Sequence, residues 1–287
     1  MNVKASNLRA AMKQGVVMCP GAWNGLVGAA VANTGFQACY ISGGATANAS
    51  GYPDIGLITL TEMCRTIKEV SHASKLPVIV DADTGYGEID CLARTIVEYE
   101  RNGAAGMHIE DQEFPKRCGH LDGKTLISQL AMEQKIKTAS ENKVSEDFVL
   151  IARTDARGVD GLDAAITRGN AYRDAGADMV FPEGLRNEEE FAEFSENCPG
   201  LLLANMTEFG KTPHITAKQF GGMGYNLVIY PVTFQRVAMG AITRGLQQLH
   251  AQGTAKGFED QMQTRQELYD LLGYVPGETW GFNNQIN

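Results

Sequence analysis

Short apolar runs alternate with longer amphipathic stretches along nearly all of the 287 residues of the chain. Most of these runs are continuously apolar, which is typical of strands that are buried on both faces. Eight strands are predicted on this basis: Val16–Cys19, Ala38–Ile41, Val78–Asp81, Gly106–Ile109, Phe148–Ala152, Met179–Phe181, Leu201–Asn205 and Leu227–Tyr230.

The segments between these strands have the character of helices. Leu60–Ser74 carries apolar residues near every third or fourth position, and Asp90–Gly103 and Gly161–Gly176 both end at Gly, a common helix stop. Eight strand–helix units favour an α/β fold, a closed (β/α)8 barrel of the TIM type, over an open sheet. Two extra helices are predicted, Ser6–Lys13 before the first strand and Gly257–Gly273 near the end.

Composition narrows the choice of partners and compartment. The net charge of −9 disfavours nucleic acid and anionic membranes, so an acidic substrate would need local Arg, Lys or a metal ion. The first residues are too polar for a signal peptide, and no apolar run approaches the roughly 18 residues of a membrane span. We therefore expect a cytoplasmic protein, or one of an organelle matrix. No linker-like segment divides the chain, so we expect a single domain over residues 1–287.

Polar residues follow almost every predicted strand, where barrel enzymes carry their active sites. They are Ser42, Gly43, Gly44, Asp81, Asp83, Glu110, Asp111, Gln112, Arg153, Asp155, Glu183, Asn205, Thr207, Glu208 and Arg236. Any one of the acidic residues could simply cap a helix. Several buried carboxylates without Cys or His beside them nevertheless favour a hard cation, Mg²⁺ or Mn²⁺, over Zn²⁺.

The loop after the fourth predicted strand contains one thiol among cations, in the sequence Lys116-Arg117-Cys118-Gly119-His120. Positive neighbours lower the pKa of a thiol, so the pattern predicts a Cys118 poised for proton transfer or nucleophilic attack. Gly119 supplies the backbone freedom of a closing lid. Two alternatives are weaker. Residues 118–125 lack the first Gly of a phosphate-binding P-loop, and a metal site at Cys118 and His120 lacks further Cys or His.

Several segments together resemble the isocitrate lyase/phosphoenolpyruvate mutase superfamily, and within it the short 2-methylisocitrate lyase branch. The loop matches the pattern K-[KR]-C-G-H of that family. The other matching segments are YISGG (40–44), VDADTGYG (80–87), HIEDQ (108–112), IARTDA (151–156), FPE (181–183), ANMTEFGKTP (204–213) and MQTRQELY (262–269). They span nearly the whole chain in the order of the family.

The resemblance implies a role for each matching residue. Asp83 would bind Mg²⁺ or Mn²⁺ directly, Asp81 directly or through water, and Glu110 would support the water shell of the metal. Cys118 would be the general acid on a mobile catalytic loop of about residues 112–128. The other implied catalytic residues are Lys116, Arg117, His120 and Arg153. As the base for the substrate hydroxyl, which the resemblance does not assign, we choose Tyr40. The implied substrate-binding residues are Ser42, Gly43, Gly44, Asp54, Gly119, Arg153, Glu183, Asn205, Thr207, Ile229, Pro231 and Arg236.

The implied reaction is the Mg²⁺-dependent cleavage of a carbon–carbon bond in a 2-hydroxy di- or tricarboxylate. Phe181, Ile229 and Pro231 would leave room for a methyl group, which favours cleavage of 2-methylisocitrate to pyruvate and succinate. The segments KRCGHLDGK (116–124) and LLGYVPGETWGFNNQIN (271–287) depart from that type and resemble the relatives that cleave 2,3-dimethylmalate or hydrolyse oxaloacetate, so these two reactions stay open as alternatives. A phosphonate-handling enzyme and a non-catalytic binding barrel are remote ones. The resemblance also implies a homotetramer, in which the helix at 257–273 can be exchanged between subunits.

Overall fold

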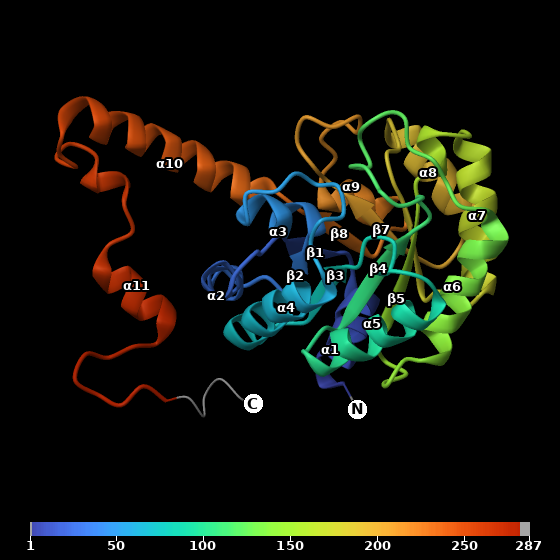
Figure 1. Ribbon diagram of the computed structural model, residues 1–287, viewed down its shortest axis with the longest axis horizontal. Helices are drawn as coiled ribbons and strands as arrows, with labels where there is room; N and C mark the ends of the chain where they lie inside the picture. Colours follow the sequence, from blue (N-terminus) through green and yellow to red (C-terminus); the bar gives the residue numbers. More distant parts are fainter. Residues whose placement is uncertain (1, 282–287) are drawn as a thin grey trace.

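The computed structural model describes residues 2–281 and places eight parallel strands in a nearly closed barrel (Figure 1). All eight predicted strands are confirmed, with bounds shifted by two residues at most. They are β1 (Val17–Pro20), β2 (Cys39–Ile41), β3 (Val78–Asp81), β4 (Gly106–Glu110), β5 (Val149–Thr154), β6 (Met179–Pro182), β7 (Leu201–Asn205) and β8 (Leu227–Tyr230). Their spatial order is β1-β8-β7-β6-β5-β4-β3-β2, so each strand lies beside its neighbour in sequence and β8 returns to β1.

The seam of the barrel lies between β1 and β2. No continuous ladder joins these two strands. A single bridge connects Gly21 with Tyr40, and the backbone N–H of Ala22 donates to the carbonyl of Tyr40 at 2.8 Å. Gly21 is required at this point, since a Cβ there would lie 2.2 Å from the carbonyl oxygen of Pro231. The end of β1 can therefore approach the end of β8 only without a side chain.

Helices surround the barrel and join successive strands. They are α2 (Gly25–Asn33), α3 (Gly43–Ala49), α4 (Leu60–Ser74), α5 (Ile89–Arg101), α6 (Gln129–Glu141), α7 (Leu162–Asp174), α8 (Glu188–Asn197) and α9 (Ala217–Gly222), with a short 3-10 turn at Ala156–Gly158. The start of α4 shows how local sequence sets these elements. Thr59 accepts a hydrogen bond from the backbone of Glu62, and Glu62 accepts one from the backbone of Thr59, which is a capping box.

The first helix, α1 (Val3–Gln14), confirms the helix predicted at Ser6–Lys13 and closes the amino end of the barrel. Ala5, Leu8 and Met12 are buried in the same apolar cluster as the inward-facing residues of the strands. Arg9 anchors the helix through an ion pair of 2.7 Å with Asp178. Because this end is filled, a ligand site must lie at the opposite end, where the strands terminate.

The C-terminal part departs from the sequence-based expectation. The long helix α10 (Thr233–Gln252) was not predicted, and it extends away from the barrel (Figure 1). The helix predicted at 257–273 is shorter than expected: a 3-10 turn (Glu259–Gln261) and α11 (Arg265–Leu272) stand there, because Thr264 begins a new helix with its own capping box. Across residues 2–281, no helix is long and apolar enough to cross a membrane.

Candidate active site

A cavity of about 170 Å³ lies at the carboxyl ends of the strands, beneath the loop that carries Cys118. Sixteen predicted residues line it: Tyr40, Ser42, Gly44, Asp54, Asp81, Lys116, Cys118, Gly119, His120, Arg153, Glu183, Asn205, Thr207, Ile229, Pro231 and Arg236. Phe181, which was predicted to leave room for a methyl group, also lines the cavity, and Asn48 and Val232 complete the lining. The structure therefore brings together side chains that lie almost two hundred positions apart in the sequence.

Four predicted site residues do not line this cavity. Gly43 uses its backbone N–H to hold the Oδ2 atom of Asp81, at 2.9 Å, so that N–H is not free for a substrate carboxylate. Arg117 is exposed and directed outward, with its guanidinium 3.5 Å from the carbonyl of Asp122. Asp83 and Glu110 lie beside the cavity, next to Asp81.

Three carboxylates at the ends of β3 and β4 form what we call the open cluster: Asp81, Asp83 and Glu110. All three residues are at least 94% buried, since none is more than 6% exposed. Both carboxylate oxygens of Glu110 and the Oδ1 atom of Asp83 accept no hydrogen bond. Their cationic contacts are an ion pair of 3.2 Å between Glu110 and Arg153 and one of 2.7 Å between Asp83 and Lys116. Buried polar atoms without hydrogen bonds are rare and mark places where a ligand or ion can bind.

The ionisation of the open cluster follows from its burial. Burial, and then repulsion by Asp81, raise the pKa of Asp83 to about 6. Burial raises the pKa of Glu110 well above its usual range, although Arg153 opposes it. Burial also works against ionisation of Asp81, but His108, Lys116 and Arg153 outweigh it and hold the pKa of Asp81 at about 2. The cluster therefore carries less negative charge than three free carboxylates, and added positive charge would stabilise its ionised form.

The donor atoms of the open cluster fit a hydrated divalent cation. Asp81 and Asp83 converge above Gly43, where a Cβ would stand 3.0 Å from one carboxylate and 3.1 Å from the other. Within residues 2–281, no three acidic, His or Cys side chains are already placed to chelate a metal ion by themselves. Mg²⁺ does not need that arrangement, because it keeps several waters and binds protein through one or two carboxylates. The oxygen-only donor set agrees with the predicted hard ion.

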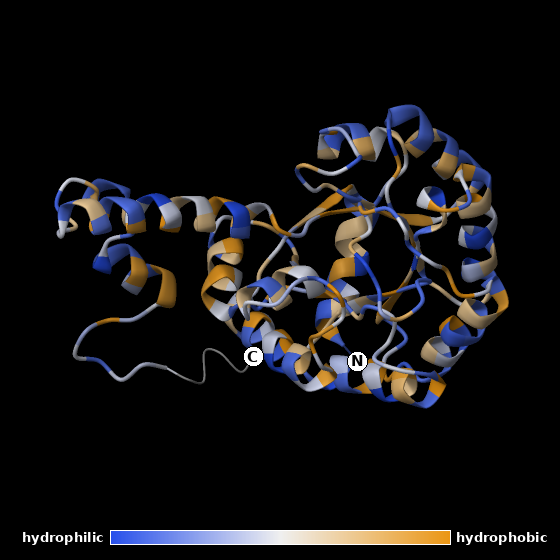
Figure 2. Cartoon of the chain, turned by 45° about the horizontal axis from the view of Figure 1, so that its top comes forward, coloured by the Kyte–Doolittle hydropathy of each residue, from blue (hydrophilic) through white to orange (hydrophobic). Residues whose placement is uncertain are grey.

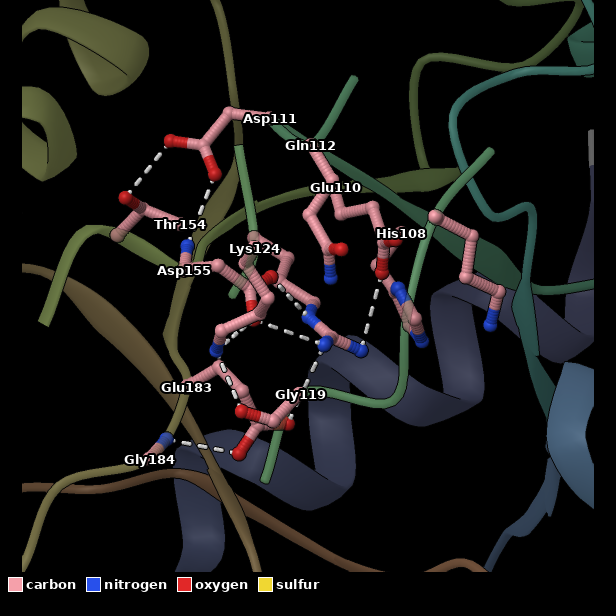
Figure 3. A network of polar contacts seen from close by, with 12 residues as sticks. His108, Glu110, Asp111, Gln112, Gly119, Lys124, Thr154, Asp155, Glu183 and Gly184 are labelled. Carbon is pink, nitrogen blue, oxygen red and sulfur yellow. Dashed lines mark hydrogen bonds and ion pairs between the residues drawn. The ribbon is translucent and has the colours of Figure 1, made fainter. Parts of the chain in front are cut away.

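A second group of buried charges lies at the end of β5, and its carboxylates accept hydrogen bonds from neighbouring residues (Figure 3). We call this group, Asp111, Lys124, Arg153 and Asp155, the paired cluster. Asp155 accepts two hydrogen bonds from Arg153, at 2.9 and 3.1 Å, and one from Lys124 at 2.7 Å. Its backbone N–H donates to Asp111 at 2.8 Å, and Asp111 also accepts from Thr154 at 2.8 Å. Burial raises the pKa of Asp155, but Arg153 and Lys124 outweigh it and hold that pKa at about 2.

Lys124 and Asp155 acquire roles that the sequence did not reveal. Asp155 had the alternative interpretation of a helix cap, but its side chain caps nothing and instead binds two cations. Residues 118–125, which nearly match a P-loop in sequence, do not form a P-loop in the structure. Lys124 points into the protein toward Asp155, and α6 begins only at Gln129, so no helix follows the loop directly.

The ionisation of Cys118 differs from the prediction. Burial raises the pKa of the Cys118 thiol, and Asp54 and Glu183 raise it further, whereas a backbone hydrogen bond from His120 and the charge of Arg153 lower it less. The prediction of a lowered pKa was wrong because the two flanking cations do not face the sulfur: Lys116 binds acidic side chains and Arg117 points outward. A thiol that stays protonated at neutral pH suits a general acid better than a nucleophile.

The catalytic loop lies directly on the strand ends. A Cβ on Gly119 would stand 2.4 Å from Arg153 Nη2 and 2.5 Å from Glu183 Cγ, so only Gly allows the loop this close. His120 Nε2 lies 3.2 Å from Glu183 Oε1, and Lys116 reaches Asp54 on the far side of the cavity. In this position the loop covers the cavity.

His108 is a buried partner of Tyr40 that sequence reasoning missed. The Tyr40 hydroxyl lies 2.7 Å from His108 Nε2, the two rings stack with centroids 5.8 Å apart, and His108 is fully buried. Burial raises the pKa of Tyr40 well above its usual range and lowers that of His108 to about 4, so both are neutral near pH 7. The period-two alternation of β4 places His108 on the barrel interior, which is the signal that could have revealed it.

The far wall of the cavity carries polar groups for an anionic ligand. The side-chain amide of Asn205 donates to Glu183 at 3.0 Å, while its carbonyl oxygen has no partner. Arg236 lies 3.3 Å from the Thr207 hydroxyl and is paired with Glu208 at 2.8 Å. Cationic and amide donors at this wall stand opposite the open cluster, so the cavity can hold a molecule with a negative group at each end.

These features define an α/β barrel with buried carboxylates at its mouth and a protonated thiol on the loop that covers its cavity. The family described as "Phosphoenolpyruvate phosphomutase" matches residues 8–250. A 2-methylisocitrate lyase of Aeropyrum pernix is 47% identical over 262 residues (91% of this chain, 84% of the relative), and a "Probable 2-methylisocitrate lyase 1" of Corynebacterium glutamicum is 47% identical over 260 residues (90% and 85%). A crystal structure of 2,3-dimethylmalate lyase superposes with a TM-score of 0.88 at 36% identity, covering 94% of this chain and 91% of the other.

The chain belongs to the phosphoenolpyruvate mutase/isocitrate lyase superfamily. Within it the chain is a lyase that is similar to the 2-methylisocitrate lyases, in agreement with the resemblance seen in the sequence.

Proposed function

We propose that the chain cleaves 2-methylisocitrate to pyruvate and succinate. The observation that carries the proposal is the position of Cys118, a protonated thiol on a loop that covers a small cavity with anion-binding groups at one wall and carboxylates at the other. A substrate with a negative group at each end fits between these walls. The 47% identity to 2-methylisocitrate lyases supports the choice of substrate.

Mg²⁺ or Mn²⁺ would be held by Asp83 and Asp81, with Glu110 supporting its water shell. A divalent ion at this site supplies the positive charge that makes a substrate hydroxyl more acidic. Glu110 accepts no hydrogen bond, and Asp83 Oδ1 pairs with the ammonium of Lys116, which supports the assignment because Glu110 keeps hydrogen-bonding capacity for bound water. Lys116 competes for the same carboxylate of Asp83, so we expect its ammonium to move when the ion binds.

The side chains of the cavity then divide the proton transfers. Tyr40 takes the proton of the substrate hydroxyl as its own proton passes to His108 Nε2, which is neutral and 2.7 Å away. The electrons of the O–H bond form the carbonyl of the 2-oxo acid, and those of the broken C–C bond remain on the carbon of the departing carboxylate. Arg153 stabilises that developing charge. Cys118 protonates the carbon, which completes the second product.

The remaining predicted residues would bind the ends of the substrate. Ser42 and Gly44 contact one carboxylate and Asn205, Thr207 and Arg236 the other. Phe181, Ile229 and Pro231 provide the apolar wall that accepts a methyl group. The similarity to the structure of 2,3-dimethylmalate lyase makes 2,3-dimethylmalate the second candidate substrate, since that molecule also presents a methyl group.

A substrate panel tests the proposal. Purified protein with Mg²⁺ is given 2-methylisocitrate, 2,3-dimethylmalate, isocitrate, oxaloacetate and phosphonopyruvate, and the formation of 2-oxo acids and of oxalate is measured. We expect the highest kcat/KM for 2-methylisocitrate. A higher value for 2,3-dimethylmalate or oxaloacetate would move the assignment to that substrate. Turnover of phosphonopyruvate alone, or of none of the five, would overturn the proposed function.

We further propose that the protein is a homo-oligomer, a tetramer in which α10 covers the barrel of a partner. Met18, on the outer face of β1, is 40% exposed, although the strands of such barrels are normally covered by helices. Of the 20 residues of α10 only Gln235 is buried, and Val237, Ile242 and Leu246 are each at least 50% exposed. Figure 2 shows hydrophobic segments along this helix where it projects from the barrel. The exchanged element would thus be α10 rather than the helix predicted at 257–273. Sedimentation that finds only monomer at micromolar concentration would contradict this.

A further inference from the structure

Lys124 is a buried lysine in the catalytic loop whose ammonium joins two parts of the site. Its side chain is 2% exposed. The Nζ atom donates to Asp155 Oδ1 at 2.7 Å and also to the carbonyl oxygen of Gly119. Figure 3 shows Lys124 between these two partners. Gly119 directly follows Cys118, and Asp155 holds Arg153 through two hydrogen bonds.

The two contacts of Lys124 differ in what they depend on. The contact with Asp155 lies within the paired cluster and needs nothing from the loop tip. The contact with Gly119 exists only while the loop lies against Arg153 and Glu183, because that close approach brings the carbonyl of Gly119 within reach. A buried ammonium that loses one of its partners is left with an unpaired donor, which is costly. Opening of the loop is therefore disfavoured by this one residue.

We propose that Lys124 is a positioning residue that latches the catalytic loop closed and couples closure to the orientation of Arg153. The thiol of Cys118 and the guanidinium of Arg153 are then held by one ammonium–carboxylate bridge. This inference rests on the proposed functions of the loop as a lid and of Cys118 as the acid.

The competing explanation is that Lys124 merely neutralises Asp155. The chain offers a matched control for this, at the opposite end of the barrel. Lys143 pairs with Asp178 at 3.0 Å, and Asp178 also pairs with Arg9 at 2.7 Å, so Lys, Asp and Arg recur there, away from the catalytic loop and the cavity. Lys124→Met and Lys143→Met each remove an ammonium from such a group, and both should lower the melting temperature.

The distinguishing measurement is the rate at which iodoacetamide alkylates Cys118, followed by peptide mass spectrometry. Cys91 is exposed and serves as an internal reference in every sample. A pH series separates access to the thiol from changes in its ionisation. We expect Lys124→Met to raise the Cys118/Cys91 labelling ratio about ten- to hundredfold and to lower kcat by a similar factor, which is the effect of one lost hydrogen bond to a charged group. The change in KM should be smaller. Lys143→Met should leave both quantities at the wild-type value.

The outcomes separate cleanly. An unchanged Cys118 labelling ratio in Lys124→Met, an equal rise in Lys143→Met, or a wild-type kcat in Lys124→Met would each overturn the latch. If Lys124→Met does not fold, Lys124→Arg is measured instead, since it keeps the charge but alters the reach, and the same criteria apply. If the wild-type protein cleaves none of the substrates, the proposed function fails, while the labelling ratio still decides whether Lys124 holds the loop.

Discussion

The open cluster and the paired cluster are two sets of buried carboxylates in the mouth of one barrel, and they differ in how completely their oxygens are hydrogen-bonded. In the paired cluster Asp155 accepts three hydrogen bonds from cations, and its pKa is held at about 2. In the open cluster both oxygens of Glu110 lack hydrogen bonds, and the pKa of Asp83 is raised to about 6. Comparable burial therefore leaves Asp155 ionised in the paired cluster but opposes the ionisation of Asp83 and Glu110 in the open cluster.

This difference indicates which carboxylates hold the protein together and which bind a ligand. A buried charge with complete hydrogen bonding contributes to a fixed arrangement of side chains, whereas an incompletely bonded one costs stability unless something binds there. The catalytic loop connects the two clusters, since Lys116 reaches the open cluster and Lys124 the paired one. Cys118 lies between these two lysines in the sequence.

The largest effect is expected from removing divalent cations. Exhaustive chelation should reduce turnover to background, because the open cluster has oxygen ligands for a divalent cation, and Lys116 and Arg153 do not fully replace the charge of that cation. Added Mg²⁺ or Mn²⁺ should restore it, as measured by 2-oxo acid formation. Full turnover in the chelated sample would show that the open cluster does not hold a catalytic metal.

The next effect concerns the acid on the loop that joins the clusters. Cys118→Ser should lower kcat by about 10²–10⁴-fold or more, because a hydroxyl is far less acidic than a thiol. Substrate affinity should change little, since the proton is delivered only in the transition state. Measuring kcat, affinity and Tm on one preparation separates this from a folding defect. A near-wild-type kcat would remove Cys118 from the mechanism.

A pair of substitutions sharpens the contrast between the clusters. Asp155→Asn should destabilise the protein by about 3–5 kcal/mol with or without metal, because it breaks a buried ion pair and leaves Arg153 and Lys124 undercompensated. Asp83→Asn should leave the Tm of the metal-free protein unchanged or higher, since it removes a carboxylate whose ionisation burial opposes. It should also abolish the stabilisation by Mn²⁺. Equal losses of Tm in both variants would contradict the distinction.

The smallest effect is in the pH dependence. With a pKa near 6 in the folded protein, against about 3.9 when unfolded, Asp83 stabilises the metal-free fold most below pH 4, and this contribution is lost as the pH rises through 6. Metal binding has the opposite sign, because protons compete with the cation. The rise in Tm with Mn²⁺ should thus be greater at pH 7.5 than at pH 5.5. In Asp83→Asn no such trend should remain.

Much of the architecture was predictable from the sequence, because each barrel strand that is buried on both faces appears as a continuous apolar run. Each apolar run, such as that ending at Asp81, marks its own strand, and the polar residue that follows marks the mouth. The position of α10 escaped prediction because a local pattern of apolar residues does not say which surface they cover. Local periodicity therefore gave no sign that the chain leaves the barrel after β8.

The site was predictable as a list of side chains but not as a set of partners. The raised pKa of Cys118 depends on where Lys116 and Arg117 point, which their adjacency in sequence does not reveal. His108 is 68 positions from Tyr40, and Lys124 is 31 positions from Asp155. Such pairs exist only once the barrel has closed, so no local pattern specifies them.

The helix α1 has a consequence for the order of events during synthesis. It leaves the ribosome before all eight strands, yet Asn2 and Arg9 bind residues between 102 and 169 positions further along the chain. The native packing partners of its apolar face are therefore absent until most of the strands have been synthesised, and until then this face stays partly exposed. A chain truncated before β6 would still lack Asp178, so nascent fragments of that length should expose Leu8 and Met12 and attract chaperones.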